Sequence, residues 1–327
     1  MIKPIDTFKD LIDTSWGFRI SKIIFTAIEL NLFTLLCKEK IEREKILKKL
    51  KLLPSAGEYF LNSLVSLGLL EKKNNKYTNS RISNKFLAKQ SGSYRGDILK
   101  HFHSGWDNWA NLEEVLYEKK STKRQKNKDD NWRSFILGMR DLGIERAEKM
   151  LSLIDFSQNE KILDLGGGPG IYSIIFAKKF SGLTADIFDL PETIKIAGEI
   201  IKNYKLEKRI STVKGNFVSD ELGSGYTMVL VSNIIHSYGT NTNHMILKKV
   251  FKSLSKGGRV VISDFILDEE KTSPLQAVLF GMHMIVNTEE GRTYTGSEVE
   301  SLLKKSGFNR IEFKRLDENT KLAIGYK

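Results

Sequence analysis

The C-terminal half of the sequence has an order of elements that few folds share. Beyond Glu160, short apolar segments alternate with amphipathic ones. Strands are predicted at 161–165, 184–188, 210–214, 228–232 and 259–264, mostly with a helix in between, and a polar turn joins two more at 310–315 and 321–326. Strand–helix–strand units form parallel pairs, whereas a short turn forms an antiparallel pair. We therefore predict a doubly wound, Rossmann-like α/β sheet of seven strands, mostly parallel with one antiparallel strand.

Residues 1–95 are predicted to form a mainly helical domain of the winged-helix type. Apolar residues recur at helical spacing between Phe18 and Leu32, and a second apolar helix follows Pro54. A helix that reads DNA needs basic or amide side chains, but segment 55–67 has no Lys or Arg. We therefore expect that helix to pack against another subunit or domain. A helical connector at 96–157 then leads to the α/β domain at 158–327.

The net charge of +12 raises the question of nucleic-acid binding. Most of the excess is diffuse, with one concentration at 119–128, and a solvating surface is the favoured interpretation. The single cysteine, Cys37, excludes internal disulfides. The N-terminus lacks the pattern of a signal peptide, and Glu29 and Asn31 interrupt the longest apolar segment. We expect a cytoplasmic protein that binds neither nucleic acid nor a membrane.

The segment 163–170 (LDLGGGPG) carries the strongest local signal. Asp164 ends a predicted strand, and glycines stand at 166, 168 and 170. Glycines let a turn bring its backbone against a ligand at the start of a helix. The third glycine comes one residue too early for a dinucleotide-binding motif. Asp189 ends the next strand, where its carboxylate can accept hydrogen bonds from both hydroxyls of a ribose.

This turn resembles the first motif of class I methyltransferases, which use S-adenosylmethionine. The chain resembles the small-molecule O-methyltransferases of that class in five further segments, 187–194 (IFDLPETI), 214–226, 229–238 (VLVSNIIHSY), 257–267 and 290–298 (EGRTYTGSE). That family includes plant caffeate enzymes, acetylserotonin O-methyltransferase and bacterial antibiotic-tailoring enzymes. Because these enzymes begin with a winged-helix-like dimerisation domain, the resemblance covers nearly the whole chain and implies a homodimer.

The resemblance implies S-adenosylmethionine as the cofactor and S-adenosylhomocysteine as its product. In the family, the residues that match Asn216 and Phe217 contact adenine, and the one that matches Asp189 holds the ribose. Asn216 stands where the family usually has aspartate, although an amide can still bond to adenine. The predicted cofactor site consists of Asp164, Gly166, Gly168, Gly170, Asp189, Leu190, Asn216, Phe217 and Ser232.

His236 is the residue predicted to carry catalysis. It follows the strand at 228–232, at the carboxyl end of the sheet, where ligands bind in open α/β folds. A neutral imidazole can take the proton of a phenol as the oxygen attacks the sulfonium methyl group. The matching histidine of the family is the general base. The alternative is a structural histidine that caps the next helix.

Two carboxylates are candidate partners of this histidine. Asp264 matches a carboxylate that orients the histidine in plant relatives. A second plant carboxylate directly precedes an Arg-Thr pair, but here Gly291 precedes that pair and Glu290 is one residue earlier. Glu290 either replaces that carboxylate or is solvated. Ser237, where the family commonly has an acid, is a further departure.

The acceptor pocket is predicted from two regions. By resemblance, the connector and the helix around residue 283 line it, and the candidate residues are His103, Trp106, Met282 and His283. His283 is otherwise a core residue. His101 and His103 point to different faces of a helix, and no cysteine or histidine cluster indicates a metal, so none is predicted.

We predict an enzyme that transfers a methyl group from S-adenosylmethionine to a phenolic hydroxyl of a small or medium-sized aromatic molecule. Methylation of carbon or nitrogen by a relative of the same fold is the main alternative, together with a relative that has lost methyl transfer. A nucleic-acid methyltransferase and a winged-helix regulator that senses S-adenosylmethionine are weaker alternatives. The sequence does not identify the acceptor.

Overall fold

The computed structural model describes residues 4–118 and 129–327. They form two compact units, one ending at Trp106 and the other running from Asp107 to Lys327. This boundary divides the predicted connector, because its first residues belong to the N-terminal unit. The basic segment 119–128 lies outside the described residues.

The N-terminal unit has the winged-helix order that the sequence predicts. Strand β3 pairs antiparallel with both β1 and β2, and Leu61, Leu64 and Tyr77 are buried in the core of this unit. We expected the second helix of the motif to pack against another subunit or domain, but its residues Leu61 and Leu64 are buried within its own unit. The elements are α1 (Phe8–Glu29), α2 (Leu32–Leu35), β1 (Ile41–Glu42), α3 (Arg43–Leu50), α4 (Pro54–Ser66), β2 (Leu70–Lys73), β3 (Lys76–Asn79), α5 (Arg81–Phe86) and α6 (Gly96–Ser104).

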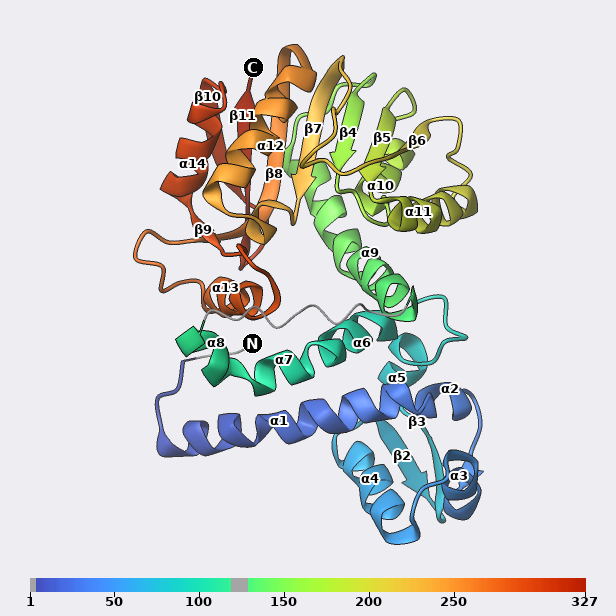
Figure 1. Ribbon diagram of the computed structural model, residues 1–327. Helices are drawn as coiled ribbons and strands as arrows, with labels where there is room; N and C mark the ends of the chain where they lie inside the picture. The colour runs from blue at the N-terminus through green and yellow to red at the C-terminus, as the bar shows by residue number, and fades with distance from the viewer. Residues whose placement is uncertain (1–3, 119–128) are drawn as a thin grey trace. The chain divides into compact units, whose positions relative to one another are not determined.

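The sheet of the C-terminal unit runs in the order β10-β11-β8-β7-β4-β5-β6 (Figure 1). Its strands are β4 (Lys161–Leu165), β5 (Thr184–Asp189), β6 (Ile210–Lys214), β7 (Tyr226–Ser232), β8 (Leu254–Leu267), β10 (Arg310–Arg315) and β11 (Thr320–Tyr326). Strand β11 is antiparallel to both of its neighbours, while β8, β7, β4, β5 and β6 pair in parallel. The predicted doubly wound sheet with one antiparallel strand is confirmed. A short strand that was not predicted, β9 (Tyr294–Thr295), pairs with the end of β8.

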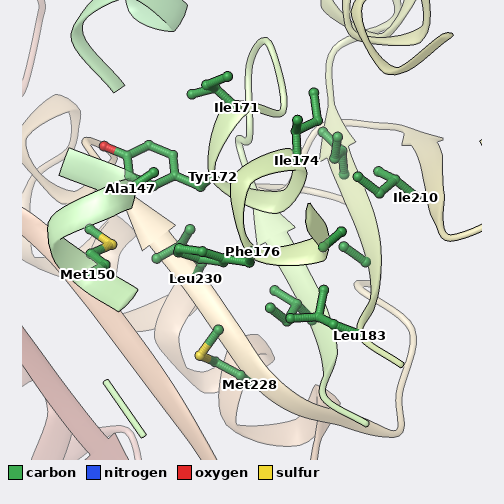
Figure 2. Packing of buried hydrophobic residues seen from close by; sticks show 14 of the residues in the cluster. Ala147, Met150, Ile171, Tyr172, Ile174, Phe176, Leu183, Ile210, Met228 and Leu230 are labelled. Atoms are coloured by element: carbon green, nitrogen blue, oxygen red, sulfur yellow. The ribbon is translucent and has the colours of Figure 1, made fainter. Parts of the chain in front are cut away.

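Helices cover both faces of this sheet. On one face, Leu230 of β7 packs in a cluster with side chains of α9 (Asp129–Leu153), α10 (Ile171–Lys179) and α11 (Pro191–Asn203). Figure 2 shows Met150 of α9 and Phe176 of α10 in this cluster. On the other face, Val231 packs with α12 (Thr240–Ser253) and α14 (Gly296–Lys305). Since successive strand residues point to opposite faces, β7 is apolar and buried without a break from Met228 to Val231.

In the sequence, Ser297 and Glu300 have the spacing of a capping box, which predicts a helix start at Ser297, but the box of α14 forms two residues earlier. Thr295 accepts a hydrogen bond from the Glu298 N–H, and the Glu298 carboxylate accepts one from the Thr295 N–H at 2.8 Å. Thr295 is held in an extended conformation as the last residue of β9, so the helix begins directly after it. The remaining elements are α7 (Trp106–Ala110), α8 (Leu112–Glu118), the 3₁₀ turn η1 (Ile235–Ser237) and α13 (Leu275–Asn287).

Candidate active site

Neighbouring parallel strands bring the predicted site residues to one edge of the sheet. Strands β8, β7, β4 and β5 lie side by side in this order. Towards their carboxyl ends lie, in turn, Asp264, Ser232, the glycine turn and Asp189. Carboxyl ends of parallel strands share one edge, which is where open α/β sheets bind ligands. These predicted residues therefore lie at one edge of the sheet.

The glycine turn between β4 and α10 contains three left-handed residues. Gly166, Gly168 and Gly170 have φ angles of 62°, 54° and 71°, which residues with a Cβ rarely adopt. The Gly166 N–H donates to the Phe188 carbonyl at 2.8 Å, which ties the turn to β5. A Cβ built on Gly168 would meet no atom within 4 Å. The middle of the turn thus faces open space that a ligand can occupy.

Asp189 is held by the backbone on both of its carboxylate oxygens. The Gly168 N–H donates to Oδ2 at 2.8 Å, and the Leu190 N–H donates to Oδ1 at 2.7 Å. Burial raises the pKa of this carboxyl, and the two backbone hydrogen bonds oppose that shift. Each oxygen retains a lone pair after accepting one N–H. The carboxylate is therefore fixed in position and can still accept two hydroxyls.

Asp164 lies beneath the glycine turn rather than beside the open space. It is 1% exposed and accepts the Ser173 hydroxyl at 2.7 Å. Burial raises its pKa to about 6, opposed by the hydrogen bond from Ser173. A Cβ on Gly167 would come within 2.7 Å of the Asp164 carboxyl carbon. The middle glycine of the GGG run is thus required by packing, a role that the sequence analysis did not assign.

Asn216 and Phe217 follow β6 and lie in the next loop along the edge. The Asn216 Oδ1 accepts the Val218 N–H at 3.0 Å, which leaves its Nδ2 without a partner among the described residues. The Phe217 ring lies against the glycine turn, because a Cβ on Gly166 would lie 3.2 Å from it. The same Cβ would lie 2.4 Å from Ile234, an apolar contact that the sequence analysis missed. Ser232, at the end of β7, accepts the Asn233 side-chain amide at 3.2 Å.

His236 and Asp264 form a buried pair. The Nδ1 atom of His236 lies 2.7 Å from Oδ1 of Asp264, and the His236 backbone N–H donates to Oδ2 at 3.3 Å. The two residues are 7% and 1% exposed. A carboxylate can only accept, so Nδ1 carries a proton, and in the neutral ring Nε2 therefore has the lone pair. This imidazole and the Phe280 ring are nearly perpendicular, with centroids 4.8 Å apart.

The turn that carries His236 is held from two other segments. The buried side chain of Asn243, in the first turn of α12, donates to the carbonyls of Ile235 at 2.8 Å and Tyr238 at 3.0 Å. The Tyr294 hydroxyl also donates to the Tyr238 carbonyl, at 2.6 Å. Beyond these, the Arg292 N–H donates to the carbonyl of His236 itself at 2.8 Å. The backbone on both sides of the imidazole is therefore fixed.

Glu290 is placed at the start of α12. Its Oε2 accepts the Gly239 N–H and the Thr242 hydroxyl, each at 3.1 Å. Among the described residues, only Asp264 hydrogen-bonds to the His236 ring. The structure thus brings Asp264 to the histidine ring and gives Glu290 the contacts of a helix cap.

Of the four predicted pocket residues, two lie on α13 in the same unit as His236. His283 stacks on Phe280, with centroids 5.9 Å apart, and on Trp109, at 6.2 Å. Burial and the neighbouring His236 lower its pKa. Met282, the preceding residue, is half-buried. Phe280 and Trp109 belong to this aromatic group, although the sequence analysis did not assign them to the pocket.

His103 and Trp106 belong to the N-terminal unit, where both contact α1. The His103 Nε2 lies 3.1 Å from the Lys22 Nζ, and its ring lies 5.4 Å from the Phe25 ring. Trp106 meets the same Phe25 ring at 6.2 Å, edge to face. Within this unit, therefore, both residues pack against Phe25 of α1.

Comparison with known proteins assigns the chain to a family. A family model described as an O-methyltransferase domain matches residues 114–309, and one described as an O-methyltransferase dimerisation domain matches residues 12–89. The chain belongs to the O-methyltransferase family. It is an S-adenosylmethionine-dependent O-methyltransferase.

Similar proteins match this O-methyltransferase over nearly their whole length. The 3-hydroxy-5-methyl-1-naphthoate 3-O-methyltransferase of Streptomyces sahachiroi is 28% identical, with 92% of this chain and 89% of that protein covered. The tetracenomycin polyketide synthesis 8-O-methyl transferase of Streptomyces glaucescens is 25% identical, with 97% and 96% covered. The crystal structure of human N-acetylserotonin methyltransferase in complex with S-adenosylmethionine shares the fold, with a TM-score of 0.87, 22% identity, and 100% and 99% covered.

The described part of this O-methyltransferase lacks two features. None of its helices is both long and apolar enough to cross a membrane. In the same residues, no three His, Cys, Asp or Glu side chains gather in a group that could hold a metal ion.

Proposed function

We propose that this O-methyltransferase moves the methyl group of S-adenosylmethionine to a phenolic hydroxyl of a small or medium-sized aromatic molecule. The observation that carries the proposal is the buried His236–Asp264 pair. It leaves one imidazole lone pair, on Nε2, at the edge of a sheet that also carries the glycine turn. The other residues of the site are assigned around this base.

The residues of the turn fit the cofactor. Open space in front of Gly168 admits a ligand to the backbone, and the fixed carboxylate of Asp189 can accept both ribose hydroxyls. Phe217 and Ile234 offer apolar surface for adenine, and the unpartnered Nδ2 of Asn216 can donate to one of its ring nitrogens. Leu190 and Ser232 complete the set, while Asp164 supports the turn from below. When bound, the cofactor supplies an electrophilic methyl group.

His236 then acts as the general base. Asp264 holds the proton of the ring on Nδ1, so Nε2 takes the proton of the acceptor hydroxyl and the imidazolium that forms stays paired with the carboxylate. Such a base contributes roughly 10²–10⁴-fold to the rate. In this assignment Asp264 is a positioning residue, and the backbone bonds from Asn243 and Arg292 keep the imidazole in place.

The aromatic side chains near His236 support an aromatic methyl acceptor. Phe265, Phe280, His283 and Trp109 form a run of near-parallel rings, each within stacking distance of the next. Met282 adds a flexible apolar side chain to the same helix. Two of the similar enzymes are named for a naphthoate and for a tetracenomycin polyketide. We extend the aromatic class, though not either molecule, to this enzyme.

We also propose that the protein is a homodimer. Large apolar side chains are exposed on α1, at Phe8, Leu11, Ile12, Trp16, Phe18 and Ile20. Apolar surface of this kind marks a protein interface, and the dimerisation-domain match covers most of this helix. Light scattering would give the mass of a dimer for the wild type, and that of a monomer for a variant carrying both Phe8→Glu and Trp16→Glu.

The central test combines calorimetry with a methylation assay. S-adenosylmethionine should bind the wild type and His236→Ala with similar affinity, and Asp189→Ala much more weakly. A panel of phenols, anilines and carbon nucleophiles with labelled cofactor should give product only from phenols, with His236→Ala inactive. Glu192→Gln, exposed near Asp189, and His244→Gln, elsewhere on α12, are the matched controls. Labelled anilines or carbon-methylated products, or a fully active His236→Ala, would contradict the proposal.

A further inference from the structure

His236 and His283 share one aromatic neighbour. The Phe280 ring lies nearly perpendicular to the His236 ring, with centroids 4.8 Å apart, and stacks on His283 at 5.9 Å with the planes 24° apart. An acceptor whose hydroxyl reaches the Nε2 of His236 is therefore close to the second imidazole. The role of His283 depends on which of its nitrogens carries the proton.

Hydrogen bonds from two neighbours fix that proton. The Trp109 indole N–H, which can only donate, lies 3.1 Å from the Nδ1 of His283. The Asn287 amide nitrogen lies 3.2 Å from the same atom, and its orientation is set because the amide oxygen accepts from Asn108 at 2.8 Å. With two donors directed at it, Nδ1 is the acceptor of the ring. A neutral His283 therefore carries its proton on Nε2.

The Nε2 atom of His283 is thus a hydrogen-bond donor, whereas the Nε2 atom of His236 is an acceptor. No described residue hydrogen-bonds to the Nε2 of His283. Burial and the neighbouring His236 lower the pKa of His283, which keeps the ring neutral. A half-buried donor without a protein partner selects a ligand that supplies an acceptor, because a ligand without one leaves the donor unpaired.

We propose that the Nε2–H of His283 donates to a carbonyl or carboxylate oxygen of the methyl acceptor. The acceptor class is then a flat aromatic molecule with two oxygen functions, the hydroxyl that His236 deprotonates and a second oxygen that only accepts. This inference rests on the proposed function, since it takes the ring surface beside His236 as the acceptor site. It adds that the second contact of the methyl acceptor is a hydrogen bond in which the protein is the donor.

The test compares two probes that differ by one group, 3-hydroxy-1-naphthoate and 2-naphthol. Dissociation constants are measured by calorimetry with the S-adenosylhomocysteine-loaded protein, and kcat/KM is measured with labelled cofactor. The wild type should favour the naphthoate by roughly 10–100-fold. His283→Phe keeps the stacking ring but removes the donor, so it should lose this preference. His283→Gln restores an N–H near the position of Nε2 and should recover part of it.

The possible results distinguish the inference about His283 from the proposed function. Equal loss of both probes in His283→Phe, or an unchanged preference, would overturn the inference, as would a wild type that binds neither probe. Binding of the naphthoate that depends on His283 without methylation of either probe would support the inference and contradict the proposed function. Trp109→Phe, which removes a donor to Nδ1 but keeps a ring, should weaken the preference by freeing the other tautomer.

Discussion

The side chain of Asn243 binds the backbone of the residue that precedes His236, donating to the Ile235 carbonyl at 2.8 Å. The same amide nitrogen also donates to the carbonyl of Tyr238, and it lies 3.0 Å from the hydroxyl of Tyr294. A fully buried amide therefore joins α12 to both ends of the turn that carries the base. It therefore holds the backbone on both sides of the imidazole.

We expect Asn243→Ala to lower kcat while the affinity for S-adenosylmethionine stays near that of the wild type. A base displaced by about 1 Å loses on the order of 10²-fold in rate, and two carbonyls lose their donors. Steady-state kinetics and calorimetry check this, with Asn241→Ala, exposed on the same helix, as the control. A loss of kcat together with an equal loss of cofactor affinity would indicate general unfolding instead. Asn243→Gln, which keeps an amide, should recover part of the rate if the role is positioning.

Asp264→Asn should abolish most of the activity without removing the histidine. Both carboxylate oxygens accept N–H groups, from His236 and Phe265, so an amide must place its own N–H opposite one of them. An amide that donates to Nδ1 moves the ring proton to Nε2, where the base is needed. We expect kcat to fall by roughly 10²–10⁴-fold with cofactor binding retained. Glu270→Gln, an exposed charge change near the end of β8, should leave kcat unchanged, and an active Asp264→Asn would remove Asp264 from the mechanism.

The sheet was predictable from the sequence because its signals are local. An apolar segment predicts β7, and a run of glycines predicts the turn at Gly166, each within a few residues. The spacing between this turn and Asp189 follows from one strand–helix–strand unit. The pair His236–Asp264 was reachable only through family resemblance, since the two residues are 28 apart and meet by strand pairing.

The surroundings of the base were not predictable in this way. In the sequence, Asn243 looks like an ordinary polar residue at a helix start. Its burial is not predictable because it depends on how α12 packs against the segment that contains Tyr294. Trp109 and His283 are 174 residues apart, and nothing in either local pattern indicates their hydrogen bond. Such contacts are set by tertiary packing, which a single sequence read for periodicity does not contain.

Glu290 allows a direct test of capping against catalysis. Its carboxylate accepts hydrogen bonds from Gly239 and Thr242 at the start of α12. The helix dipole also stabilises a negative charge at this end of a helix. Glu290→Gln can still accept both hydrogen bonds, so we expect kcat to stay within a few-fold of the wild type. Glu290→Ala removes the cap and should lower the free energy of unfolding by about 0.5–2 kcal/mol. A large loss of kcat in Glu290→Gln, with unchanged stability, would instead show that the charge itself takes part in catalysis.

The buried carboxyl of Asp164 should make stability depend on pH. Burial raises its pKa to about 6, from about 3.9 in the unfolded chain, so between these values the folded protein binds the proton more tightly. Stability is then highest when the carboxyl is protonated and falls as pH rises through this window, by about 3 kcal/mol at most. Asp164→Asn does not titrate and can still accept the Ser173 hydroxyl. Urea unfolding of the cofactor-free protein should therefore show the variant gaining stability relative to the wild type between about pH 4 and about pH 6, with little further change above that range. Glu192→Gln controls for the loss of an exposed charge, and a stability difference that does not change with pH would contradict the raised pKa.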